Sequence, residues 1–319
     1  MLRFLIRRIF LGVVTMWVVA TAVFILYFVA PHNVAQTLAG RQATAQTVAL
    51  IRQRLGLNHS IISQYGSYLW RLLQGNLGYS YVNSVPVTTI IKQDLPVTAS
   101  VAIGGAVLWL LIGVVSGVFA ATHPRSVTDR TVTGFALFFY SMPTFLLGEL
   151  ALLVLFYRLH LAGFTYFPGS GYVGLTQSVS GWFQHMILPW ITIALVTAAT
   201  YSRLTRASML DVLGEDYIRT ARSKGISDRR VVYRHGLRSA LTPVVTQFGI
   251  DLGTLLGGII VTETVFGLPG LGQQIYNSIS REDLPVIIGL VLLASAFIVA
   301  ANILVDLFYA VLDPRVRLS

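Results

Sequence analysis

Residues 99–122 read ASVAIGGAVLWLLIGVVSGVFAAT, a run of 24 residues without a single charge. An α-helix rises about 1.5 Å per residue, so about 20 apolar residues cross the hydrocarbon core of a bilayer. The run is therefore predicted to be a membrane-spanning helix. Five further stretches of 17 to 28 residues resemble it, and together they predict six spans: 9–30, 99–122, 131–157, 186–202, 241–266 and 285–312.

The composition of the whole chain agrees with these spans. Of its 319 residues, 55% are hydrophobic and only 11% are charged, whereas soluble domains carry about 25% charged residues. This excludes an ordinary soluble enzyme and a disordered chain. The absence of cysteine excludes disulfides, thiolate chemistry and zinc–sulfur sites. We therefore expect an all-α polytopic membrane protein with six transmembrane helices.

The basic residues predict how the spans are oriented. With six spans both termini lie on one side, and that side carries sixteen of the 23 Lys and Arg residues. The positive-inside rule then places both termini in the cytoplasm. The first span is too long for a signal-peptide core and is expected to stay in the mature protein. We interpret the net charge of +10 as membrane topology and expect no nucleic-acid partner.

The spans divide the chain into three parts. Residues 1–30 contain the cytoplasmic N-terminus and the first span, and residues 99–319 form a five-helix core. Between them, residues 31–98 form an extracytoplasmic segment. Within it we expect amphipathic helices at 45–55 and 61–73, and a further helix with apolar Val87, Ile90 and Ile91 that leads to Leu95-Pro96. This segment is expected to form a small helical cap.

The cytoplasmic loop 203–240 has a pattern of its own. Leu213, Tyr217 and Ala221 are spaced i, i+4 and i+8 and form an apolar stripe on a short helix. Gly225 is placed to end that helix, and Ser227 is placed to cap the next one. A projecting helix–Gly–helix unit suits insertion into a groove on another protein. A loop lying on the membrane surface is equally compatible with these residues.

Several stretches resemble the permease subunits of ABC importers. Residues 216–230 (DYIRTARSKGISDRR) and 234–238 (RHGLR) resemble the ATPase-coupling loop. Only Ala221, Gly225 and Leu237 match the general form of that loop, but Arg-Thr-Ala-Arg-x-Lys-Gly is typical of the branch that imports dipeptides, oligopeptides and nickel. Further stretches resemble the same branch: 75–80 (GNLGYS), 263–272 (ETVFGLPGLG) and 312–315 (LDPR). The long segment after the first span resembles the first of the branch's two permeases.

The resemblance implies a type I ABC importer permease fold in a prokaryotic inner membrane, and a transport subunit that is not an enzyme. The implied partners are a homologous second permease in a heterodimer, two ABC ATPase subunits that hold ATP and Mg²⁺, and an extracytoplasmic solute-binding protein. No cofactor is expected in this chain. The implied substrates are dipeptides or oligopeptides, with nickel or another small solute as the alternative.

The resemblance also implies which residues couple the chain to an ATPase, with Tyr217 and Ala221 as the buried ridge of the contact. The expected coupling residues are Gly214, Glu215, Asp216, Tyr217, Arg219, Thr220, Ala221, Arg222, Lys224, Gly225 and Ser227. A passive channel is the rival interpretation, and the coupling loop argues against it. A membrane-embedded enzyme is another, but the common hydrolase and phosphate-binding motifs do not occur in the sequence, and no catalytic residue is expected.

Acidic residues inside spans are candidates for the transport pathway, because a charge in a membrane is costly. Glu149 and Asp251 lie well inside their spans, and either could instead hydrogen-bond a neighbouring helix. Glu263 lies near a span end, where an outward carboxylate would suit a peptide amine. Pro269 belongs to residues 267–272 (GLPGLG), which predict a broken or re-entrant element at the outer mouth. Pro143 is expected to kink the third span.

Overall fold

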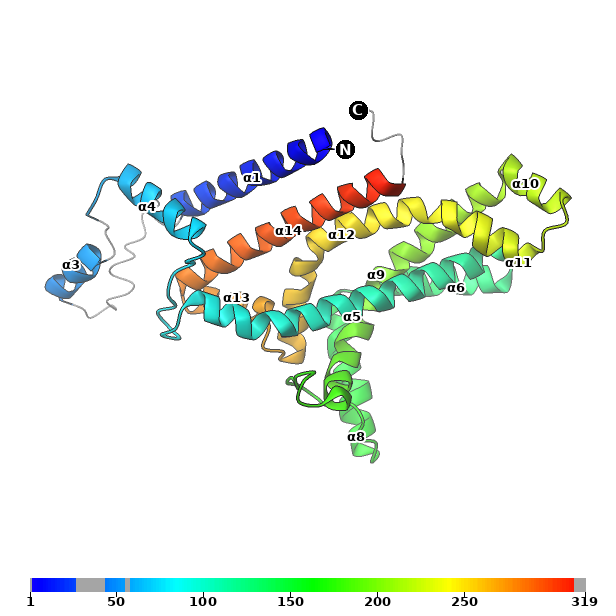
Figure 1. Ribbon diagram of the computed structural model, residues 1–319. Helices are drawn as coiled ribbons and strands as arrows, with labels where there is room; N and C mark the ends of the chain where they lie inside the picture. The colour runs from blue at the N-terminus through cyan, green and yellow to red at the C-terminus, as the bar shows by residue number, and fades with distance from the viewer. Residues whose placement is uncertain (1, 27–43, 55–57, 313–319) are drawn as a thin grey trace. The chain divides into compact units, whose positions relative to one another are not determined.

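A computed structural model describes residues 2–26, 44–54 and 58–312 of the chain (Figure 1). Several predicted features lie partly outside these residues: the end of the span 9–30, the beginning of the segment 31–98 and most of the LDPR stretch. The described elements are helices, as the sequence predicts. They are α1 (Leu2–Phe24), α3 (Ala45–Arg54), α4 (Ile61–Leu73), α5 (Val87–Thr122), α6 (Val127–Tyr140), α7 (Thr144–Ala151), α8 (Leu159–Leu161), α9 (Val179–Leu213), α10 (Asp216–Ser223), α11 (Asp228–Arg230), α12 (Leu237–Phe266), α13 (Leu271–Ser280), α14 (Leu284–Leu312) and two π-helices, η2 (Leu152–Arg158) and η3 (Val231–Gly236).

Five of these helical stretches are long and apolar enough to cross a membrane. They are Ile6–Phe24, Val87–Thr122, Thr144–Leu161, Val179–Leu213 and Leu284–Val305. The remaining expected span, 241–266, lies within α12, a helix of 30 residues. Several side chains of α12 between positions 253 and 258 are not described, so the span 241–266, the fifth along the chain, stays a prediction.

The helix expected to lead to Leu95-Pro96 continues beyond Pro96. The structure has one helix of 36 residues, α5, which contains Pro96 and joins the helix expected before it to the span 99–122. A proline removes one backbone hydrogen bond, and packing can offset that loss. Val97 and Val101 are buried on the core face just after Pro96, and the Ser100 hydroxyl donates to the Pro96 carbonyl at 2.7 Å.

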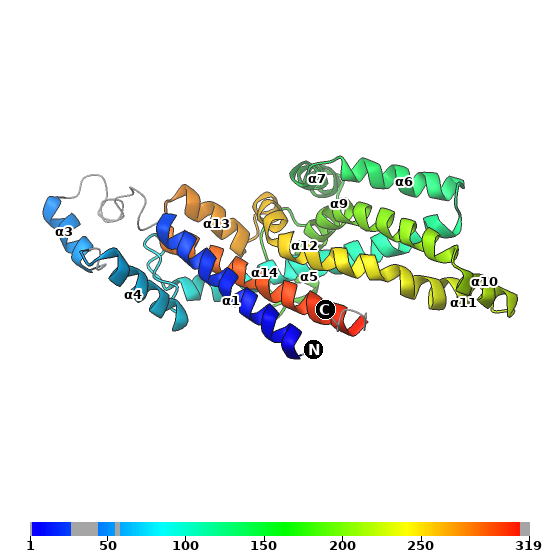
Figure 2. The same cartoon turned by 90° about the horizontal axis from the view of Figure 1, so that it is seen from above.

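The third expected span, 131–157, is broken rather than kinked. Helix α6 ends at Tyr140, and α7 begins at Thr144, after Pro143 in an extended conformation. Figure 2 shows α7 end-on while α6 runs lengthwise, so the chain turns steeply between them. Pro143 has no N–H with which to continue the helix of α6, and this explains the break. The apolar stretch long enough to span is Thr144–Leu161.

The chain divides into two compact units. The first comprises residues 1–93 and 275–303. In its core, Phe24 of α1 and Tyr68 of α4 pack with Ile288 and Leu292 of α14. The side of α1 that carries Gly12 lies close to α14, because a Cβ at that position would be 2.8 Å from a methyl carbon of Val299.

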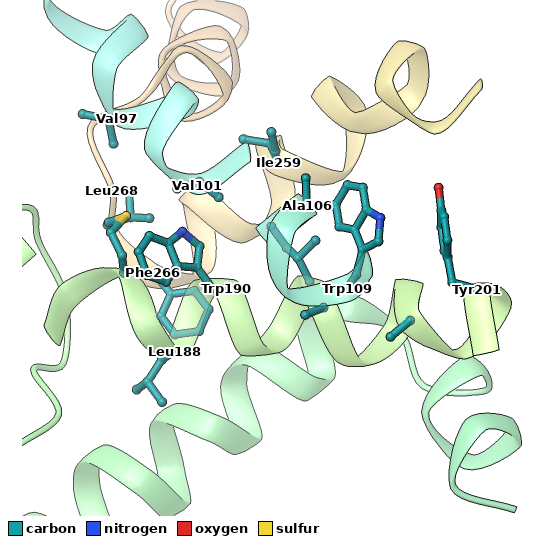
Figure 3. Packing of buried hydrophobic residues seen from close by; sticks show 14 of the residues in the cluster. Val97, Val101, Ala106, Trp109, Leu188, Trp190, Tyr201, Ile259, Phe266 and Leu268 are labelled. Carbon is teal, nitrogen blue, oxygen red and sulfur yellow. The ribbon is translucent and has the colours of Figure 1, made fainter. Parts of the chain in front are cut away.

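The second unit comprises residues 94–274 and 304–319. Helix α9 lies between α6 and α12 in both views (Figures 1 and 2). The core of this unit runs along α9, with Trp190 near Phe266 in one part and Trp109 facing Tyr201 in another (Figure 3). Helix α5 packs closely on α9, because a Cβ on Gly113 would lie only 2.4 Å from Tyr201 Cβ. Small residues allow such close approach of helices in membranes.

Candidate functional site: the coupling segment and the buried carboxylates

The predicted coupling segment forms the tip of the second unit. Figure 1 shows α10 and α11 beyond the ends of α9 and α12. Helix α9 is capped at Gly214, Glu215 precedes α10 in an extended conformation, and α11 leads through η3 into α12 without a loop. Pro243 lies inside α12, about two turns after its start. The segment is a short helix joined to two long ones.

A small apolar cluster holds α10 against the rest of the chain. Ile218 and Ala221 of α10 are buried against Val231 of η3, and Leu213 and Ile226 pack beside them. The expected ridge of Tyr217 and Ala221 is therefore divided. Ala221 faces its own chain, because it lies three residues from Ile218 on the same side of the helix, whereas 46% of Tyr217 is exposed.

The exposed face of α10 carries the ring of Tyr217 among polar and charged side chains. The Tyr217 hydroxyl lies 3.2 Å from Ser239 Oγ, so the ring is anchored at its tip. Arg219 lies 3.5 Å from Asp216, and Arg222 lies 3.4 Å from Asp228. Ion pairs this exposed contribute little to stability. The basic side chains are thus available to a partner at small cost.

Gly225 ends α10 as the sequence predicts. Its φ of +75° lies in the left-handed region, and its N–H donates to the Arg222 carbonyl at 2.9 Å. A Cβ at this position would meet nothing within 4 Å, so the requirement for glycine is one of backbone conformation. Ser227 occupies the N-cap of α11, but its side chain makes no capping hydrogen bond, in contrast to the prediction.

The tip is packed onto three long helices. Next to the α10 cluster, Val118 and Ala121 of α5 are buried with Met209 of α9 and Ala240 of α12. Leu213 belongs to the edge of both clusters. Through Leu213, the packing of α10 is continuous with the cluster that joins α5, α9 and α12.

Glu263 lies inside the protein and does not face outward as expected. It is 0% exposed. Its Oε1 accepts from the Thr98 hydroxyl at 2.6 Å, and its Oε2 accepts from the Gln273 N–H at 3.0 Å. A Cβ on Gly270 would collide with this carboxylate. Glu263 thus fixes the turn between α12 and α13, and both of its oxygens are engaged by the protein.

The turn itself confirms the predicted break after the fifth span. Helix α12 ends at Phe266, Gly267 takes a left-handed conformation with φ +59°, and α13 begins at Leu271. Pro269 is exposed at this turn, whereas Leu268 is buried. Of the residues proposed for the pathway in this region, Pro269 is the one that is accessible.

Asp251 joins two helices. The Tyr201 hydroxyl of α9 donates to its Oδ2 at 2.7 Å, and Gln247 Nε2, one turn earlier in α12, donates to its Oδ1 at 2.9 Å. Hydrogen bonds to both oxygens offset much of the cost of an acid in a span. The structure therefore gives Asp251 a helix partner, which was one of the two predicted alternatives.

Glu149 is exposed on α7. It lines a groove together with Phe156, Tyr157, Gly169 and Val265. The structure therefore does not bring the three candidate acids together: Glu263 and Asp251 are bonded to separate partners, and Glu149 faces this groove. Among the three, Glu149 is the one marked by an exposed side chain.

Sequence reasoning missed the partners of these acids. Thr98 is 165 positions from Glu263, and Tyr201 is 50 positions from Asp251. A third pair, Asp129 and Arg206, is 77 positions apart. Thr98 and Tyr201 lie in apolar stretches where no periodicity marks them, and helix packing alone brings them to the acids.

A helical chain with several helices long and apolar enough to cross a membrane defines an integral membrane protein. Residues 113–318 match the family described as binding-protein-dependent transport system inner membrane component, and residues 1–102 match the N-terminal part of the same membrane components. The chain belongs to this family. It is thus a multi-pass inner-membrane permease subunit of an ABC transporter and not an enzyme, and it works with a solute-binding protein and with ATPase subunits.

Several known proteins are similar in sequence to this chain over nearly its full length. A probable peptide ABC transporter permease protein of Sinorhizobium fredii is 37% identical over 314 residues, which cover 98% of this chain and 99% of the relative. A putative peptide transport system permease protein of Brucella abortus is 39% identical over 313 residues, 98% of each chain. The glutathione transport system permease protein GsiC of Escherichia coli is 38% identical over 317 residues, 99% of each chain.

Proposed function

We propose that this chain is a permease subunit of an ATP-driven importer of short peptides, a class that includes glutathione-like tripeptides. The observation that carries the proposal is the full-length similarity to peptide and glutathione permeases at 37–39% identity. Substrate reaches the permease on the solute-binding protein, and closure of the ATPases drives alternating access.

The proposed complex places this chain beside a homologous second permease, above two ATPase subunits that hold ATP and Mg²⁺. Both termini lie in the cytoplasm, as the distribution of basic residues supports. The exposed face of α10, with Tyr217 at its centre, docks in a cleft of one ATPase. Arg219, Arg222 and Lys224 contact the rim of that cleft.

The geometry of the tip supports this coupling role. A coupling element must stay rigid while the partner moves it, since a flexible loop would absorb the displacement. Ile218 and Ala221 are packed against the chain, and the adjacent cluster joins α5, α9 and α12. Movement of the ATPase would therefore shift the spans as a body.

The test is uptake into proteoliposomes that contain this chain with its partner permease, ATPases and binding protein. We expect uptake of labelled dipeptide or glutathione that requires both ATP and the binding protein. Uptake without ATP would identify a passive channel and overturn the proposal. ATP-dependent uptake of nickel without peptide uptake would overturn the peptide assignment and leave the importer assignment standing.

A further inference from the structure

A groove between α6 and α9 carries an uneven set of charges. It has a volume of about 940 Å³, within the range of about 300–1,000 Å³ that is usual for small-molecule sites. One acid and three arginines line it: Asp129, Arg130, Arg203 and Arg206. The other lining groups include the apolar side chains of Leu137 and Leu204.

One of the three arginines is already neutralised. Arg206 donates from Nε to Asp129 Oδ1 at 2.6 Å and from a terminal nitrogen to Oδ2 at 2.7 Å, a two-point pair. The Arg125 N–H also donates to Asp129 Oδ2, at 2.9 Å. The Arg206 guanidinium, together with this backbone N–H, lowers the pKa of Asp129 to about 2. This acid therefore remains charged at neutral pH.

The other two arginines have no carboxylate partner among the residues that the structure describes. Arg130 is exposed at the start of α6. Arg203 is exposed one turn from Arg206 on α9, and its guanidinium lies 5.9 Å from the centre of the Tyr140 ring. The groove thus has two uncompensated positive charges, and Tyr140 restrains one of them.

The surroundings of the groove favour an amphiphile over a soluble anion. The exposed side of α6 carries large apolar residues, with Phe135 65% and Phe138 58% exposed, and a surface of this kind faces lipid in a membrane protein. The short loop 123–126 follows directly after α5, whose apolar stretch Val87–Thr122 is long enough to cross a membrane, and α6 begins at Val127. The start of the groove is therefore placed near the membrane surface. Cationic groups over an apolar wall at that depth match a phosphate headgroup with an acyl chain below it.

We propose that this groove binds an anionic phospholipid, with its phosphate held between Arg130 and Arg203 and an acyl chain along Leu137 and Leu204. The site relies on the membrane placement of the chain and goes beyond its role in transport. On the proposed orientation it lies in the cytoplasmic leaflet, where anionic lipids attract basic residues.

The experiment is native mass spectrometry of the whole transporter complex titrated with phosphatidylglycerol and, separately, with phosphatidylcholine. We expect R130Q/R203Q to bind phosphatidylglycerol roughly 30-fold more weakly, because each arginine near a charged membrane surface contributes about a fivefold factor. R130K/R203K retains most of the binding, since the charges remain. Phosphatidylcholine binding is the same in all variants.

The charge-matched control is R158Q/R281Q, which removes two exposed arginines outside the groove. It should bind phosphatidylglycerol as the unmodified chain does. An equal loss in this control, or unchanged binding in R130Q/R203Q, would overturn the proposal. So would displacement of the lipid by millimolar inorganic phosphate, which identifies a site for soluble anions. A crosslink from Leu137→Cys to the second permease in lipid-filled membranes would assign the groove to a protein interface and also overturn the proposal.

Discussion

The hydroxyl of Thr98 bridges Glu263 and the start of α13. It donates to Glu263 Oε1 at 2.6 Å and accepts from the Leu271 N–H at 2.8 Å. One side chain of α5 therefore holds both the end of α12 and the first turn of α13. All three groups are buried, so a missing bond would leave a polar atom without water to replace its partner.

Replacement of this hydroxyl should destabilise the protein. Thr98→Val keeps the shape of the side chain but removes both hydrogen bonds, and we expect a free energy of unfolding lower by about 1–3 kcal/mol. Thermal unfolding of the purified complex measures the change. Thr98→Ser keeps the hydroxyl and is the matched control. Equal losses in the two variants would show that packing of the methyl group, and not the hydroxyl, holds the turn.

The contribution of the Asp129–Arg206 pair to the free energy of unfolding should change with pH only under acidic conditions. The pKa of Asp129 is lowered from 3.8 to about 2 in the folded chain, so the native state favours the carboxylate. Its contribution is complete above about pH 4 and is lost as the pH falls through about 2. The measurement is the difference in unfolding midpoint between the unmodified chain and Asp129→Asn.

That difference should be constant from pH 5 to pH 8 and shrink below pH 4. Asp129→Asn is the reference for the unmodified chain, because all other carboxylates titrate in both proteins and cancel in the difference. A difference that already shrinks between pH 7 and pH 5 would contradict the lowered pKa.

Tyr217 should matter for coupling and not for folding. The ring is 46% exposed, so Tyr217→Ala removes a proposed docking contact while the buried cluster stays in place. We expect ATP-dependent uptake to fall at least about tenfold, as for truncation of an aromatic residue at the centre of an interface. The ATPase activity measured in parallel should no longer respond to loaded binding protein.

Tyr233→Ala is the matched control, because Tyr233 is 50% exposed on η3, outside α10. It should transport within about twofold of the unmodified chain. If both variants transport normally, the ATPase does not dock on this face of α10.

Gly225 provides a test of backbone conformation alone. Its φ is +75°, and a Cβ there would meet nothing within 4 Å. Gly225→Ala should therefore lower the free energy of unfolding by about 1–2 kcal/mol through left-handed strain, without any clash. Thermal unfolding of the purified complex again gives the change.

The control for this substitution is Gly66→Ala. Gly66 lies in α4 and also has open space around it, but its backbone is helical. Here alanine should raise the free energy of unfolding by about 0.5–1 kcal/mol, because glycine is the poorer helix former. If both substitutions change the free energy of unfolding in the same direction, the left-handed conformation of Gly225 does not determine the effect of alanine there.

The corrections to the sequence-based expectations share one cause. Pro96 and Pro143 have the same local effect on a helix, yet α5 continues through the first and the chain breaks at the second. Buried neighbours on both sides of Pro96 support a continuous helix. No residue of the short segment around Pro143 is buried, so nothing there offsets the missing hydrogen bond. Local rules identify the weak point, and packing decides whether it breaks.

The sequence by itself determined the helical class, the membrane placement and the helix–Gly–helix form of the coupling segment. Each depends on near neighbours in the chain: the length of an apolar run, the spacing along one helix, or the backbone freedom of Gly225. Only the tertiary structure decided that Glu263 is buried, that Ala221 faces its own chain, and that Arg130 and Arg203 share a groove. These relationships join residues on different helices, and no local pattern records which faces meet when helices pack.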